Sequence, residues 1–101
     1  MTESAVRIGD AGELFLSGVL DYRTGPDLRK QGQALIKASE APALVVDCSA
    51  VEKSSSVGLA LLLAFMRDAA QDGKSLSIRA MPLDMREIAE VSELTELLAV
   101  H

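Results

Sequence analysis

Three consecutive serines, at positions 54–56, stand directly before an apolar run from Val57 to Met66. Hydroxyls placed there could cradle a phosphate, act as a nucleophile, carry a modification or cap the helix that follows. A phosphate-binding loop needs several glycines and a lysine just before the helix hydroxyl. This segment has one glycine, Gly58, and its lysine, Lys53, lies upstream. The spacing argues against a phosphate loop and predicts that one of the serines caps a helix.

The other residues that could do chemistry are few. The only histidine, His101, is the last residue, and the only cysteine, Cys48, lies in an apolar stretch. A nucleophilic serine needs a base beside it, and a metal site needs several ligands at defined spacing. The sequence therefore predicts a protein that is not an enzyme, with no cofactor and no metal site. A single cysteine also suits a reducing compartment.

Length and composition favour one soluble domain, predicted over residues 1–101. Of the 101 residues, 49% are hydrophobic and 25% are charged, and the formal net charge is −5. The acidic balance argues against nucleic acid as a partner and against docking on anionic lipid. The longest apolar run is about half the length that a membrane span needs, and the N-terminus lacks the apolar segment of a signal peptide. We expect a cytoplasmic protein without direct membrane insertion.

The pattern along the chain predicts an α/β fold. Two β-prone stretches, 5–8 and 14–20, are separated by glycine and aspartate, which favours a hairpin. A helix is expected to start near Thr24 and Pro26, and the valine-rich segment 43–49 is typical of a strand covered on both faces. Three further elements complete the prediction: a helix over 57–72 ended by Gly73, a strand over 75–81 and a helix after Pro82. A mixed sheet with a leading hairpin and parallel βα crossovers follows.

The helix predicted over 57–72 has an unusual outer side. Projection at 100° per residue gathers one apolar group that should face the core: Leu59, Leu62, Met66, Ala69 and Ala70. Four polar residues, Arg67, Asp68, Gln71 and Asp72, point away from it, as a solvated side should. The first half of that outer side is apolar instead, with Val57, Ala60, Leu61 and Ala64. Either another element of the domain covers these four residues, or a partner does.

The segment "VVDCSAVEKSSSVGLALLL" resembles the signature of STAS domains, the fold shared by bacterial anti-sigma factor antagonists and the cytoplasmic tails of sulfate transporters. The strand part of the family pattern is matched at Val46, Asp47, Ser49, Ala50 and Val51, and the helix start at Gly58 and Leu59. "LSGVLD" and "LSIRAMPLDMREIAEVSELTELL" are similar to the segments around the family's first and last helices. The resemblance covers nearly the whole chain and implies a STAS-like fold.

The resemblance also implies a role for Ser56. The phosphorylatable Ser or Thr of the family lies two positions before the glycine, which is Ser56 here, and the acid that precedes it in kinase-regulated members is replaced by Ser55. The run "GLALLL" is most similar to STAS subunits of phospholipid-transporting ABC complexes. Such a subunit would bind the ATPase at the inner-membrane face and support outer-membrane lipid asymmetry. The alternative is an anti-sigma factor antagonist that an anti-sigma factor kinase switches by phosphorylating Ser56.

These inferences combine into one expected partner interface, with Ser56 capping the helix at the contact and serving as a possible phosphorylation or switch site. The interface residues are Lys53, Ser54, Ser55, Ser56, Val57, Ala60, Leu61 and Ala64. The first three would lie with Ser56 in the loop before the helix, and the last four would enter a groove on the partner.

Overall fold

The computed structural model describes residues 4–98, which form four strands and three helices. The chain opens with the predicted hairpin: β1 (Ala5–Ile8) pairs antiparallel with β2 (Leu14–Leu20). The turn between them contains Gly12, whose φ of +85° lies in the left-handed region that glycine enters without steric cost. Glycine and aspartate thus signalled this turn correctly.

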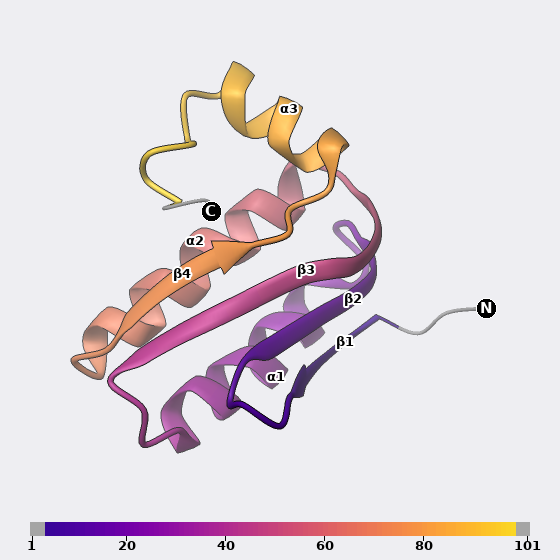
Figure 1. Ribbon diagram of the computed structural model, residues 1–101. Helices are drawn as coiled ribbons and strands as arrows, with labels where there is room; N and C mark the ends of the chain where they lie inside the picture. Colours follow the sequence, from indigo (N-terminus) through magenta and orange to yellow (C-terminus); the bar gives the residue numbers. More distant parts are fainter. Residues whose placement is uncertain (1–3, 99–101) are drawn as a thin grey trace.

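The sheet has the order β1-β2-β3-β4, and its last three strands are parallel. Helix α1 (Gly25–Ala38) connects β2 to β3 (Ala43–Ser54), and α2 (Ser56–Gln71) connects β3 to β4 (Ser75–Arg79). Helix α3 (Leu83–Val91) follows β4 and packs near α2 (Figure 1). This mixed sheet with a leading hairpin and parallel βα crossovers confirms the predicted α/β fold.

Several boundaries differ from the prediction. The central strand β3 runs to Ser54 and not to residue 49, because β2 continues to pair with it as far as Leu20 opposite Ser54. The last strand ends at Arg79, since Ala80 has a φ of +56° that breaks the extended chain. Helix α2 begins one residue earlier than predicted and ends at Gln71, followed by Gly73 with φ +72°.

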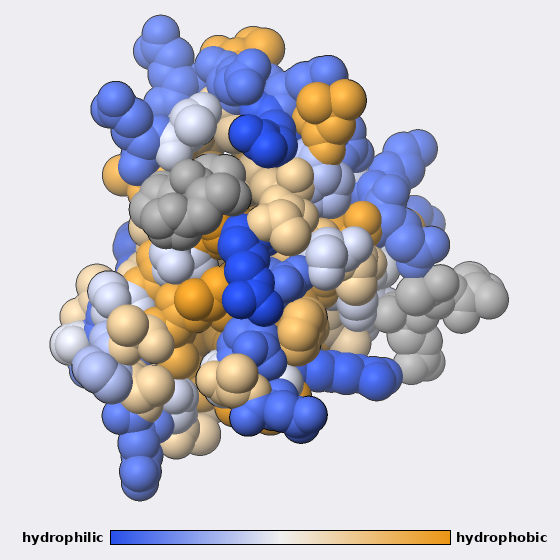
Figure 2. All heavy atoms as spheres, viewed as in Figure 1, coloured by the Kyte–Doolittle hydropathy of each residue, from blue (hydrophilic) through white to orange (hydrophobic). Residues whose placement is uncertain are grey.

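Helices α1 and α2 lie together on one face of the sheet, and the prediction that β3 is covered on both faces was wrong (Figure 1). Val46 and Cys48 face the helices and are fully buried, whereas Ser49, of the opposite parity, is exposed. The opposite face is polar at its centre: Arg79 Nε donates to Asp47 Oδ2 at 2.8 Å. Figure 2 shows hydrophilic side chains crossing the middle of the molecule on this side, between hydrophobic ones.

Close contact between α1 and α2 depends on one missing side chain. The ring of Phe65, fully buried on α2, occupies the space where a Cβ of Gly32 on α1 would stand. Leu28 and Ile36, one turn before and after Gly32, are also buried. Gly32, a weak helix former, therefore lets the two helices approach, and the groove between them carries the candidate site.

Candidate functional site

The carboxyl ends of β2 and β3 bring the first turns of α1 and α2 side by side. The backbone N–H of Ser55 donates to the carbonyl of Leu20 at 3.0 Å, which ties the start of α2 to the end of β2. Thr24, at the start of α1, donates its hydroxyl to the carbonyl of Val19 at 2.9 Å. Both helix starts are therefore held by the same strand, and residues from two distant segments form one surface.

The three serines have three different environments. Ser54 is the last residue of β3, is buried, and donates its hydroxyl to the carbonyl of Ser55 at 2.8 Å. Ser55 is the N-cap of α2, because its Oγ accepts from the N–H of Val57 at 3.1 Å. Ser56 is the exposed first residue of α2 and takes no part in these bonds. The prediction that a serine caps the helix is confirmed, but the assignment of the cap to Ser56 was wrong.

The predicted loop before the helix is shorter than expected. Lys53 and Ser54 belong to β3, so only Ser55 stands between that strand and α2. Lys53 and Ser56 are exposed on either side of this junction. Ser55 is exposed too, so three of the four polar residues expected at a partner contact stay accessible, whereas the buried Ser54 supports the junction from inside.

The apolar outer side of α2 is covered in part by α1. Leu61 and Ala64 are 5% and 4% exposed, whereas Ala60 is exposed and Val57 is half-buried. The uncovered part is a hollow of about 280 Å³ between the first halves of the two helices. Its lining comprises Gly25, Pro26 and Arg29 of α1 with Val57, Ala60, Leu61, Ala64 and Arg67 of α2. Both possibilities that the sequence left open are therefore correct in part. Helix α1 covers Leu61 and Ala64, whereas Ala60 stays open to a partner.

The polar residues on the outer side of α2 differ in their exposure. Arg67, Gln71 and Asp72 are exposed as predicted, but Asp68 is only 7% exposed. Its Oδ1 lies 3.5 Å from Arg29 Nη2 and 3.5 Å from Gln33 Nε2, both on α1. The sequence contained a signal for this position, since Asp68 follows Leu61 and Ala64 at the spacing of seven and four that keeps residues on one helix side.

Ala70 was placed on the core side and is exposed, because the sheet lies closer to the side that carries Phe65 and Ala69. The described residues contain no group of three or more His, Cys, Asp or Glu that could hold a metal ion. His101 lies outside the described residues. Between residues 4 and 98, no helix is long and apolar enough to cross a membrane.

Two side chains of β3 have shifted pKa values. Burial, with a smaller effect of the Asp47 charge, raises the pKa of the Cys48 thiol to about 12. Burial would raise the pKa of Asp47 itself, but hydrogen bonds from Ser49 and Arg79 outweigh it and hold the pKa below its usual range. Neither group lies in the α1–α2 groove, and both shifts are those of structural side chains.

Comparison with solved structures finds two informative relatives. A chain of the Acinetobacter MlaFEDB complex in an ATP-bound conformation is 26% identical with a TM-score of 0.82, over 95% of this chain and 98% of that one. An anti-sigma factor antagonist from Mycobacterium paratuberculosis is 28% identical with a TM-score of 0.78, over 98% and 84%. A STAS-domain protein from Planctomyces limnophilus, 14% identical with a TM-score of 0.75 over 99% and 91%, shares the fold.

A search among curated proteins finds no significant match. The family model described as "Mlab, STAS domain" matches residues 4–99, which is nearly the whole chain and includes the β3–α2 junction. This match agrees with the four-stranded mixed sheet and with the structural neighbours, so the chain belongs to the MlaB family of STAS domains.

Proposed function

We propose that this domain is a non-catalytic subunit that binds and regulates the ATPase of a phospholipid-transporting ABC complex, and so supports outer-membrane lipid asymmetry. The observation that carries the proposal is the open apolar hollow at the start of α2, beside the exposed Ser56. The match to the MlaB family model and the similarity to a chain of the MlaFEDB complex over 95% of the domain support this partner. Binding to the ATPase would hold the domain at the inner-membrane face without its own membrane segment.

The hollow suits a helix or short segment of the ATPase. Ala60 is small and exposed, so a partner backbone can approach α2 closely there, while Val57 offers a half-buried apolar contact. Arg29 and Arg67 stand at the rim and can pair with acids around an apolar anchor. Regulation then requires that the domain bind one conformation of the ATPase more tightly than another.

The test is co-purification with an ABC-transporter ATPase subunit from the same organism, using two matched substitutions on α2. Ala60→Glu fills the hollow with a charged side chain that must lose its water when the partner enters, so binding should weaken by about 2 kcal/mol, or about thirtyfold. Ala70→Glu places the same charge on the exposed second half of the helix and should leave binding unchanged. Equal binding by both variants would exclude the hollow as the contact.

Ser56 gives a second test of the same surface. Ser56 is exposed and directly precedes Val57, which lines the hollow, and Ser56→Asp adds charge there without removing the cap that Ser55 provides. We expect reduced pull-down of the ATPase with an unchanged circular dichroism spectrum. Normal pull-down by Ser56→Asp would show that the contact does not reach the first residue of α2.

The alternative function is that of an anti-sigma factor antagonist, favoured by the 28% identity with the antagonist from Mycobacterium paratuberculosis and by the exposed hydroxyl of Ser56. A phosphate on Ser56 would add about two negative charges and release a bound partner. Incubation with ATP and an anti-sigma factor kinase from the same organism, followed by intact mass measurement, separates the two functions. Stoichiometric phosphate that is lost in Ser56→Ala would favour the antagonist, and no phosphate would favour the transporter subunit.

A further inference from the structure

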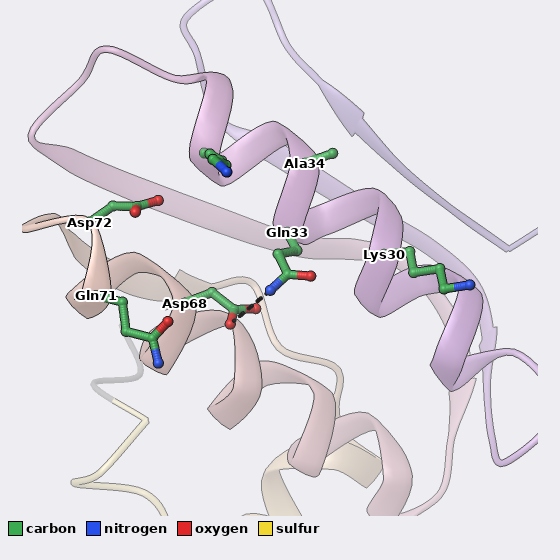
Figure 3. Close-up of a pocket in the computed structure, with 7 residues that line it drawn as sticks. Lys30, Gln33, Ala34, Asp68, Gln71 and Asp72 are labelled. Carbon is green, nitrogen blue, oxygen red and sulfur yellow. Dashed lines mark hydrogen bonds between the residues drawn. The ribbon is translucent and has the colours of Figure 1, made fainter.

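A second cavity lies farther along the same groove, between the later turns of α1 and α2 (Figure 3). Its volume is about 460 Å³, and it is polar where the first hollow is apolar. Helix α1 contributes Lys30, Gln33, Ala34 and Lys37, and α2 contributes Asp68, Gln71 and Asp72. The sequence comparison and the proposed ATPase contact leave this cavity without a role.

Asp68 carries the one buried side-chain polar atom without a hydrogen-bond partner among the described residues. Its side chain is 6% exposed, yet Oδ2 has no hydrogen-bond partner among them. The contacts of Oδ1 with Arg29 and Gln33 are both 3.5 Å long, well beyond the 2.7–2.9 Å usual for a charge-assisted bond. A buried carboxylate is costly unless it is paired and hydrogen-bonded. Asp68 therefore has unused capacity to accept bonds from a cation.

The basic side chains of the domain do not supply that cation. Arg29 is 48% exposed and reaches Oδ1 alone. The side chain of Lys30 extends away from Asp68 in the close-up (Figure 3). Lys37 and Lys30 take part in none of the ion pairs formed by residues 4–98, and both are exposed, so they can turn into solvent. The second oxygen of Asp68 therefore has no donor among residues 4–98, and because it is buried, a donor from outside reaches it only when a covering side chain moves.

We propose that this cavity receives an arginine side chain of a partner protein. A guanidinium carries five N–H donors in a rigid planar fork, and it is less strongly hydrated than an ammonium. One edge can donate to Asp68 Oδ2 while another donates to Gln71 or Asp72, which lie three and four residues further along, at the end of α2. Gln33 contacts the carboxylate from α1 and is exposed, so in the proposed complex its side chain rotates away and the guanidinium takes its place.

A protein is the favoured source because the cavity continues the groove that begins with the apolar hollow. Arg29 lines that hollow and also contacts Asp68, so it joins the two sites. A single partner segment could place an apolar residue against Ala60 and an arginine against Asp68. The assignment of the arginine to the ATPase rests on the proposed function, whereas the binding of a guanidinium by the cavity does not.

Titration of the ¹⁵N-labelled domain with N-acetyl-arginine amide tests the cavity without any ATPase. We expect saturable chemical-shift changes at the side-chain amide of Gln33 and the backbone amides of Asp68 and Asp72, at millimolar concentrations. N-acetyl-glutamine amide is similar in shape but uncharged, and should cause no saturable change at these signals. Equal responses to the two probes, or no response to the arginine probe, would overturn the proposal.

Two variants locate the effect. Asp68→Asn keeps the volume and can still accept from Arg29 and Gln33, but it lacks the charge, so affinity for the arginine probe should fall about tenfold or more. Glu90→Gln removes an exposed carboxylate on α3 and should bind the probe like the parent chain. Thermal unfolding and the parent spectrum verify that each variant is folded. Unchanged affinity in a folded Asp68→Asn variant would refute the role of Asp68, whatever the ATPase experiments show.

Discussion

Substitutions at Ser55 and Ser56 should separate the stability of this domain from its binding. The two serines are adjacent, but only Ser55 has a structural hydrogen bond to the first turn of α2. Ser55→Ala removes the oxygen that accepts from the N–H of Val57, whereas Ser56→Ala removes an exposed hydroxyl. The prediction is that the first variant unfolds more easily and the second does not.

The magnitude follows from the contacts. Loss of a serine N-cap costs about 1 kcal/mol. The carbonyl of Leu20 keeps its bond from the Ser55 backbone at 3.0 Å, so no second buried group loses its partner. For a domain of this size, about 1 kcal/mol lowers the melting temperature by about 4–8 °C. Ser56→Ala should change the free energy of unfolding by less than about 0.5 kcal/mol.

Ser56→Asp should shift the two measurements in opposite directions. The first turn of α2 contains no acid, so an aspartate there should stabilise the helix by about 0.3–1 kcal/mol through its dipole. The same charge should weaken capture of the ATPase. Differential scanning calorimetry and pull-down on one set of preparations would measure both. A stable Ser55→Ala together with an unstable Ser56→Ala would refute the assignment of the cap.

Three further outcomes follow from the core and the open face of the sheet. Gly32→Ala should lower the free energy of unfolding by about 1–3 kcal/mol, measured by urea denaturation, because the new methyl group overlaps the ring of Phe65. Because the pKa of Asp47 is lowered in the fold, its carboxylate should stabilise the domain at pH values above the ordinary pKa of 3.8, and this contribution should be lost as the pH falls through the lowered pKa. Acid unfolding measures it: Asp47→Asn should lose less stability than the parent chain over that pH range. Cys48, buried with a pKa of about 12, should resist thiol reagents at pH 8 until the protein is unfolded in urea.

The order of elements was predictable because it depends on local patterns. Gly12 and Gly73 marked a turn and a helix end, and both adopt the left-handed conformation that those positions require. The short valine-rich run marked the central strand, and the helical spacing of apolar residues marked α2, so the α/β fold followed from them. The polar face of the sheet was harder to predict from the sequence. A charged residue such as Asp47 in an apolar strand does not reveal its partner on the neighbouring strand, which here is Arg79.

The cap illustrates what a run of identical residues conceals. Serines 54–56 have the same propensity, and the choice among them depends on where β3 stops. The carbonyl of Leu20 on the neighbouring strand sets that point by accepting from the N–H of Ser55. A bond between residues 35 positions apart is invisible to a local pattern. The resemblance to the family implied a role for Ser56 but carried no information about which hydroxyl caps the helix.

Asp68 shows how the same reasoning can be extended. Helical periodicity put this residue in line with Leu61 and Ala64, and its charge alone suggested that the line ends in solvent. The structure shows instead that α1 runs alongside α2 far enough to cover the carboxylate, since Gly32 lets the helices come close. An acidic residue that continues a row of apolar residues facing a neighbouring helix, as Asp68 continues Leu61 and Ala64, is therefore a candidate binding residue. In this domain, the proposed partner surface thus extends from the hollow at the start of α2 to the cavity at Asp68 in its last turns. The arginine titration tests the cavity independently of the hollow.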